Sequence, residues 1–293
     1  MQSSSLHIIS KIRDYRLLIK FSLSVMVAFS AVVAYLLAPK VERFDWSMIG
    51  LLFLGGLLVT GSANAMNEIA EKDTDALMKR TANRPIAAGR MSVSEALTAA
   101  VLMLIAGLLI LVLLFNVLSA AVSLVSWFIY AYMYTPLKKV SSVSVLVGAV
   151  PGALPCLIGW AAGNDDLGWG GWILFAIQFF WQFPHFWAIA WVAHNDYASA
   201  GFKLMPSVEG PTKYSALQSV IYSLMMIPIG MLPYWYGMSG IVSFWIVLAA
   251  NLFILWQSVR LFREMERSAA RRVMFSSYFY LPLVLLTLLA DKL

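Results

Sequence analysis

Long apolar runs separated by shorter polar segments make up most of this chain. An α-helix needs about 20 predominantly apolar residues to cross the hydrocarbon core of a bilayer, and nine runs reach or approach that length. The pattern therefore predicts an all-α fold, a polytopic membrane bundle of about nine transmembrane helices in one domain covering residues 1–293. The predicted spans are 17–37, 47–68, 92–114, 118–135, 143–163, 170–193, 214–236, 240–259 and 273–290.

The composition agrees with this interpretation. The chain is 61% hydrophobic and 12% charged, whereas soluble domains are typically about 45–50% apolar and about 25% charged. The first apolar run is long enough to span, so it is interpreted as the first helix and not as a cleavable signal peptide. Cys156 is the only cysteine, which excludes an intrachain disulfide and a thiolate metal cluster.

The basic residues predict an orientation. If the N-terminal segment 1–16 is cytoplasmic and the spans alternate, all 21 Lys and Arg residues except Lys40, Arg43 and Lys292 fall on the cytoplasmic side. This asymmetry follows the positive-inside rule, so the net charge of +6 is a topology signal and nucleic acid is not an expected partner. The long connections after the second and sixth spans are then cytoplasmic, and loops of that length are usually functional.

The connection after the second span holds the densest mixed-charge cluster of the chain. If the helix continues past residue 66, Asn67, Glu71 and Asp75 recur every fourth residue and share a face, whereas Asp73 lies nearly opposite Glu71. Such oxygen ligands suit Mg²⁺, which typically bridges to substrate phosphates, and arginine matches phosphate oxygens. A solvated loop that only enforces topology is the alternative. The basic residues that follow are Lys79, Arg80 and Arg84.

Two more polar groups stand inside or beside later spans. Tyr134, Lys138 and Lys139 belong to "YTPLKK" after the fourth span, where an interfacial tyrosine with positive-inside lysines is the alternative to a site. His185 lies within the sixth span, where a histidine is costly unless it is paired or functional. A hydrogen-bonded structural histidine is the alternative there. His194, at the end of the span, is interpreted as interfacial.

The acidic motif resembles the first aspartate-rich motif of the UbiA-type intramembrane prenyltransferases, a superfamily with nine transmembrane helices. The resemblance rests on Asn67, Glu71 and Asp75 followed by "KRTANRP". The superfamily usually has Asp where this chain has Glu71. The carboxylate is therefore kept, on a side chain one methylene longer.

Two later stretches are similar to the haem-modifying branch of that superfamily. The stretch 141–160 is one, with Ser141 and Ser144 where Thr and Asn are usual. "PHFWAIA" followed by "DYASAGFKLMP" is the other, with a histidine in the apolar part. Quinone-type members carry several aspartates in this region, and here only Asp196 remains. The aromatic residues around His185 either pack as an interface belt or line a prenyl and porphyrin pocket.

The resemblance implies an enzyme of a bacterial inner or plasma membrane that joins the farnesyl group of farnesyl diphosphate to a vinyl group of haem B, with addition of water. Haem B is then a substrate, Mg²⁺ the cofactor, and proteins that oxidise haem O or assemble oxidases are implied partners. His185 would ligate the haem iron or position the water. The implied catalytic residues are Asp75, Asp196, Lys138, Tyr134 and His185. The implied substrate-binding residues are Lys79, Arg80, Arg84, Lys139, Lys203, Trp181 and Phe183. The implied metal ligands are Asn67, Glu71, Asp75 and Asp196.

Two alternatives follow from the same residues, one within the enzymes and one of a different functional class. A prenyltransferase for a quinone-type or other aromatic acceptor is disfavoured by the single Asp196 and by His185. A non-catalytic haem transporter or assembly factor would explain nine spans and a buried histidine. It would not explain an acidic helix face opposed by arginines.

Overall fold

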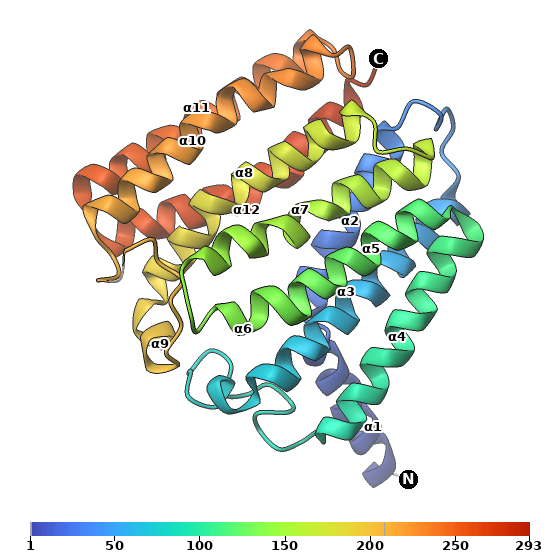
Figure 1. Cartoon of the computed structure of the whole chain (residues 1–293), viewed down its shortest axis with the longest axis vertical. Coiled ribbons are helices and arrows are strands. Elements are labelled where there is room, and N and C mark those ends of the chain that lie inside the picture. Colours follow the sequence, from blue (N-terminus) through green and yellow to red (C-terminus); the bar gives the residue numbers. More distant parts are fainter. Residues whose placement is uncertain (1, 208) are drawn as a thin grey trace.

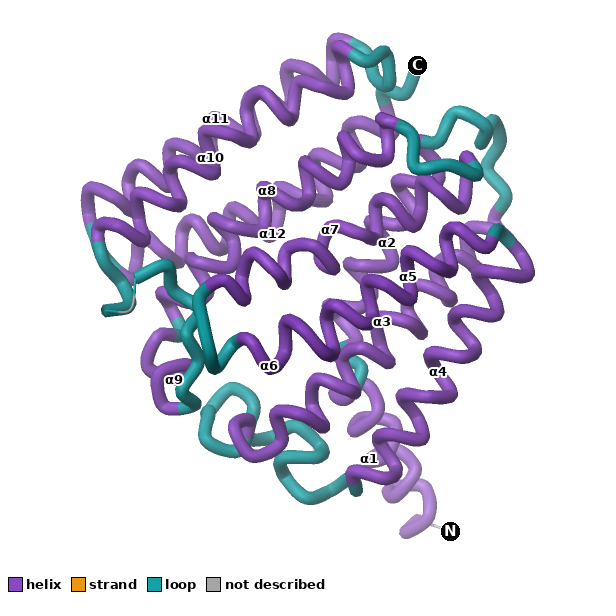
Figure 2. Tube along the Cα trace, viewed as in Figure 1, coloured by secondary structure: helices purple, strands orange, loops and turns teal. Residues whose placement is uncertain are grey.

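The computed structural model describes residues 2–207 and 209–293, with side chains from Ile9 onward. Figure 1 shows a bundle of long helices packed side by side. In Figure 2 the longest loops gather at the end of the bundle that carries α9, and shorter loops connect the helices at the other end. The helices are α1 (Gln2–Leu18), α2 (Phe21–Leu37), α3 (Trp46–Asp75), α4 (Val93–Leu114), α5 (Val117–Phe128), the π-helical turn η1 (Ile129–Tyr134), α6 (Thr135–Leu137), α7 (Val143–Asn164), α8 (Trp169–Val192), α9 (His194–Ser199), α10 (Lys213–Trp235), α11 (Ile241–Glu264) and α12 (Arg267–Ala290).

The predicted all-α bundle of about nine spans is confirmed for the described residues. Eight segments are long and apolar enough to cross a membrane, and the pair Ile9–Leu18 and Phe21–Leu37, bent by 55°, supplies a ninth if it is counted as one span. The fourth span, between residues 117 and 137, consists of α5, η1 and α6 in sequence. The predicted and observed bounds differ most at α3, which continues to Asp75 instead of ending near residue 68.

The break between α1 and α2 is stabilised by side chains of α2 and α3. Lys20 adopts a left-handed backbone conformation with φ of 47°, which costs energy for a residue with a Cβ atom. The carbonyl of Ile19 accepts hydrogen bonds from Ser24 Oγ at 2.6 Å and from Asn64 Nδ2 at 3.2 Å. These bonds replace the helical bonds lost at the break. They also fix the direction in which the Lys20 side chain points.

Helix α7 lies at the centre of the bundle. In its apolar window 72% of the residues are buried, against 17% in α4 at the periphery. Gly159 allows α7 to approach α2 closely, because a Cβ atom at this position would lie 1.8 Å from the carbonyl oxygen of Ala31. Pro151 and Pro155 lie inside α7, and the carbonyl of Pro151 accepts a hydrogen bond from Ser126 Oγ at 3.3 Å.

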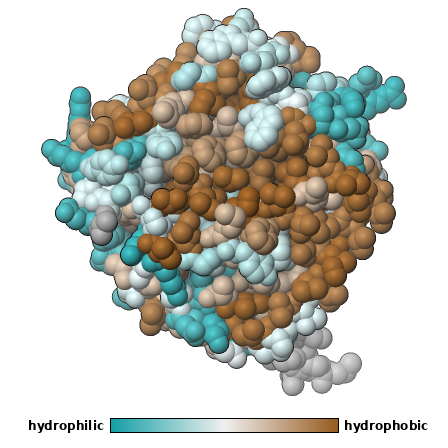
Figure 3. All heavy atoms as spheres, viewed as in Figure 1, coloured by the Kyte–Doolittle hydropathy of each residue, from teal (hydrophilic) through white to brown (hydrophobic). Residues whose placement is uncertain are grey.

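The outer surface is apolar across the middle of the bundle, and Figure 3 shows a broad hydrophobic face flanked by hydrophilic ends. Large tryptophans are exposed where helices begin or end away from α9: Trp46 is 78% exposed, Trp169 72% and Trp235 62%. Tryptophan rings of this kind favour the membrane interface. The protein is therefore an integral, multi-pass membrane protein.

The C-terminal residues close this same end of the bundle. Lys292 Nζ donates to the carbonyls of Leu36, Ala38 and Val41 at 2.8, 3.0 and 3.1 Å. A cation is favourable at the C-terminus of a helix, here α2, because the last carbonyls there lack helical partners. Lys292, one of the three basic residues outside the predicted cytoplasmic set, thus has a structural role.

Candidate active site

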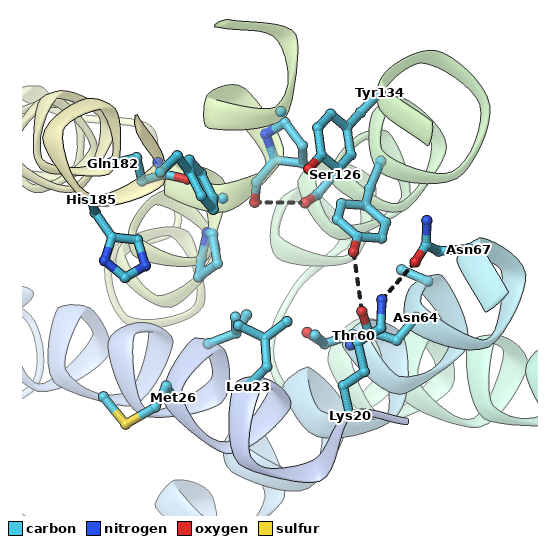
Figure 4. A pocket seen from close by; sticks show the side chains of 18 of the residues that line it. Lys20, Leu23, Met26, Thr60, Asn64, Asn67, Ser126, Tyr134, Gln182 and His185 are labelled. Atoms are coloured by element: carbon cyan, nitrogen blue, oxygen red, sulfur yellow. Dashed lines mark hydrogen bonds between the residues drawn. The ribbon is translucent and has the colours of Figure 1, made fainter. Parts of the chain in front are cut away.

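A cavity of about 350 Å³ opens near the α9 end of the bundle and extends between the helices. Its volume lies within the range of small-molecule sites. The part near the loops is lined by charged residues of α3 and the following loop, and the deeper part by apolar and aromatic residues of α2, α5, α7 and α8. Figure 4 shows Lys20, Asn64 and Asn67 on one side of this cavity and Gln182 and His185 on another.

The acidic face of α3 forms one wall of the charged part. Asn67, Glu71 and Asp75 all line the cavity and are at most 4% exposed. Asp73 points the other way and is exposed. Because α3 runs to Asp75 without a break, the helical phase expected from the spacing of four holds.

Each of the three α3 side chains meets a basic residue from elsewhere in the chain. Lys138 Nζ lies 2.8 Å from Glu71 Oε1, and Arg84 Nη1 lies 2.6 Å from Asp75 Oδ2. Lys20 Nζ donates to Asn67 Oδ1 at 2.6 Å. Buried ion pairs add little net stability, because desolvation opposes the Coulomb attraction. Their concentration at one cavity mouth therefore points to binding.

The charged cluster retains acceptor atoms that no described side chain or backbone group satisfies. Asp75 Oδ1 and both carboxylate oxygens of Glu68 are buried without a hydrogen-bond partner among the described residues. The Arg84 guanidinium lies between the two acids, with Nε 3.5 Å from Glu68 Oε1. Burial opposes the charge of Arg84, but Asp75 and Glu68 outweigh it and raise its pKa. Of these two acids only Asp75 lines the cavity, so its oxygen is the one that a divalent cation in the cavity can reach.

Two residues of this charged cluster were absent from the sequence interpretation. Glu68 precedes Asp75 by seven residues, or two helical turns, so its phase was a usable signal. Lys20 carried no such signal, because a lysine at the start of an apolar run is also what the positive-inside rule predicts. Only its contact with Asn67, across 47 residues of sequence, brings Lys20 into the site.

The structure does not bring all the expected ligands together. Asp196 lies on α9, is partly exposed, and is not among the residues that line the cavity. Within the described ranges, no three Asp, Glu, His or Cys side chains are placed to hold one metal ion. The set of Asn67, Glu71, Asp75 and Asp196 therefore stays a prediction.

The expected phosphate-binding residues divide into two groups. Arg80, Arg84 and Lys138 line the cavity, and Arg80 donates to the hydroxyl of Tyr197 at 3.0 Å. The other three are exposed and do not line it: Lys79, Lys139 and Lys203.

Tyr134 orients the buried lysine. Lys138 Nζ lies 4.5 Å from the centre of the Tyr134 ring, a cation–π contact that holds the ammonium toward Glu71. The ring packs directly on the backbone of Gly148, where a Cβ atom would lie 2.6 Å from it. The π-helical turn η1 ends at Tyr134, and such turns are frequent at functional sites.

The deeper part of the cavity contains His185. Its imidazole stacks on Trp181, with ring centres 4.7 Å apart and planes at 19°, and Nδ1 lies 2.7 Å from Ser277 Oγ. Both His185 and Trp181 line the cavity.

Phe183, the other aromatic residue expected to bind substrate, does not line the cavity. Its ring is fully buried against Val145, Trp187 and Tyr222.

Changes at Glu71 test whether its charge is needed in this cluster. Glu71→Gln should lower turnover by about 100-fold, because the amide removes the anion facing Lys138 and any cation bound there. Glu71→Asp should retain a substantial part of the activity, since the carboxylate is kept. Initial rates on purified protein at saturating substrate measure both. Wild-type activity of Glu71→Gln would exclude Glu71 from the metal site.

A membrane bundle whose cavity has a charged mouth and an apolar interior fits an intramembrane transferase. Residues 27–281 match the model of the UbiA prenyltransferase family, and the chain belongs to this family. The predicted family and the predicted transferase class are thereby confirmed.

Curated relatives extend the match over almost the whole chain. A protein of Cytophaga hutchinsonii is 44% identical over 283 residues, covering 97% of this chain and 99% of its own length. A protein of Flavobacterium johnsoniae is 40% identical over 295 residues, and the match covers 99% of this chain and 97% of that protein. Both are named protoheme IX farnesyltransferase.

Solved structures show the same fold at low identity. A structure of digeranylgeranylglyceryl phosphate synthase superposes with a TM-score of 0.79 at 17% identity, covering 96% of this chain and 98% of that one. A UbiA homologue of Archaeoglobus fulgidus, bound to GPP and Mg²⁺, superposes with a TM-score of 0.69 at 16% identity. The superposition covers 94% of this chain and 99% of that one.

Proposed function

We propose that this protein transfers the farnesyl group of farnesyl diphosphate to a vinyl group of haem B and thereby makes haem O. The observation that carries the proposal is a single cavity with two chemically distinct parts. Its charged mouth suits a diphosphate with a divalent cation, and its apolar chamber with His185 suits an isoprenoid and a porphyrin. The names of the full-length relatives support the same reaction.

At the mouth, the acidic side chains would bind the metal ion and the basic side chains the diphosphate. Asn67, Glu71 and Asp75 would hold Mg²⁺, joined by Asp196 if α9 moves toward them. When bound, that ion supplies positive charge that stabilises the leaving diphosphate. Lys138, Arg80 and Arg84 would bind the remaining phosphate oxygens. Lys20, held at the mouth by the break between α1 and α2, adds a fourth cation.

In the chamber, the protein keeps the reacting carbon atoms away from bulk water. The C1–O bond of farnesyl diphosphate breaks and the diphosphate leaves with the electron pair. The vinyl π electrons of haem B then form the new carbon–carbon bond, and water adds to the cation on the porphyrin side chain and loses a proton. Aromatic faces such as that of Trp181 stabilise an allylic cation by about 0.5–2 kcal/mol each. His185 would contact the haem.

A product assay tests the proposal directly. Purified protein is incubated with haem B and farnesyl diphosphate, with and without Mg²⁺, and the porphyrin products are identified by mass. Haem O should form only when both substrates and the ion are present. Haem binding without any product would favour the transporter alternative. Prenylation of an added quinone precursor in place of haem would favour the other acceptor class.

We propose that the cavity mouth faces the cytoplasm, because most basic residues gather at this end of the bundle. Single cysteines at Asp73 and Glu42, both exposed positions at opposite ends of α3, should react with a membrane-impermeant thiol reagent from opposite sides. The native Cys156 is buried and should stay unlabelled. In intact cells only the cysteine at position 42 should react, and labelling at position 73 instead would reverse the orientation.

A further inference from the structure

Ser277 of α12 contacts two aromatic rings of α8 at once. Its hydroxyl oxygen lies 2.7 Å from Nδ1 of His185, and its backbone carbonyl accepts a hydrogen bond from Trp181 Nε1 at 3.0 Å. These are the two rings that stack on each other in the deep part of the cavity. Ser277 itself is fully buried. One residue of a neighbouring helix therefore fixes the orientation of both rings.

The hydrogen bonds of Ser277 also determine which nitrogen of His185 carries the proton. A hydroxyl group has a single proton, and that of Ser277 points to the carbonyl oxygen of Met274 at 2.6 Å. Ser277 Oγ is then the acceptor in its contact with His185, so Nδ1 of the imidazole is the donor. A neutral imidazole carries one N–H. Nε2 therefore keeps its lone pair.

Nε2 of His185 has no competing partner in the part of the chain that the structure describes. Among the described residues, Ser277 is the one hydrogen-bond partner of the His185 ring, and the other neighbours of the ring are Trp181, Phe186 and Tyr278. Since His185 lines the cavity, a ligand there can reach its ring. Figure 4 shows the imidazole at the cavity wall, across from Leu23 and Met26 of α2.

We propose that Ser277 is a positioning residue that holds His185 as the Nδ1-protonated tautomer and presents Nε2 to the haem iron. This inference rests on the proposed function, in which haem B occupies the apolar chamber. Histidines that bind a metal usually donate their other N–H to an oxygen acceptor, which fixes the ring and raises its basicity. The hydroxyl of Ser277, anchored on Met274, is such an acceptor.

Haem titration of purified variants tests this role, with the absorption spectrum reporting nitrogen ligation. Ser277→Ala should weaken haem B binding by about 10–100-fold and lose the spectrum of imidazole-ligated haem. Binding of farnesyl diphosphate with Mg²⁺ should stay unchanged. Ser277→Thr keeps the hydroxyl and should keep the ligated spectrum. Ser223→Ala is the matched control, because Ser223 is also buried and bonded to a helix carbonyl but contacts Ser258 and not His185.

A double-mutant cycle separates positioning from packing. If Ser277 acts through His185, then Ser277→Ala should add no further loss of haem affinity to His185→Ala. An additive loss, or an unchanged spectrum in Ser277→Ala, would overturn the inference while the proposed function stands. Wild-type haem bound without a nitrogen ligand would overturn the iron contact. Wild-type protein that binds no haem and forms no haem O would overturn the proposed function itself.

Discussion

Replacing Asp75 by asparagine should lower the rate of farnesyl transfer by about 10³-fold, equivalent to roughly 4 kcal/mol of activation free energy. Asp75 has one buried oxygen that no described residue hydrogen-bonds, and its other oxygen pairs with Arg84 at 2.6 Å. The amide keeps the shape of the side chain but removes the charge that a divalent cation needs. Arg84 would retain Glu68 as a neighbouring anion, so the variant should still fold.

Asp73→Asn is the matched control for this change. Asp73 lies two residues away on the same helix, but it is exposed and does not line the cavity. Its replacement should leave the rate within about twofold of the wild-type rate, because most surface substitutions have small effects. Both variants are compared at equal membrane abundance with the product assay. Equal losses at the two positions would mean that the helical phase of α3 does not select the functional acid.

His185→Ala should reduce haem O formation by about 10²–10³-fold while leaving the affinity for farnesyl diphosphate and Mg²⁺ within about twofold. His185 lies on α8, whereas Glu71 and Asp75 lie on α3. The imidazole stacks on Trp181 and contacts the hydroxyl of Ser277, and it makes no hydrogen bond or ion pair with the described charged residues of the mouth. We therefore expect it to contact the porphyrin and not the diphosphate.

Separate measurements of haem and diphosphate affinity on the purified variant decide this assignment. His194→Ala is the control, because His194 packs against the loop at Gly210 and does not line the cavity. It should leave both affinities nearly unchanged. If His185→Ala abolishes diphosphate binding but not haem binding, His185 belongs to the metal site or to its support.

The sequence alone determined the membrane fold and part of the site. Nine apolar runs predict the spans, because crossing a bilayer imposes both length and apolar composition on a helix. The spacing of Asn67, Glu71 and Asp75 predicts one shared face, because helical phase depends only on residue number. Both expectations rest on local, periodic signals, and α3 continues without a break to the last of these residues.

Only the tertiary structure decided which side chains meet. Lys20 reaches Asn67 from a break in the first helical segment, and Ser277 reaches His185 across 92 residues of sequence. Phe183 looked equivalent to Trp181 in the sequence but faces other helices, while Asp196 lies on α9 outside the cavity lining.

Contacts between distant segments depend on how whole helices pack against one another. Close approaches, such as that of Gly159 to Ala31, set this packing. The length of an apolar run determines that a helix crosses the bilayer, but the packing of its neighbours determines which of its side chains face the cavity.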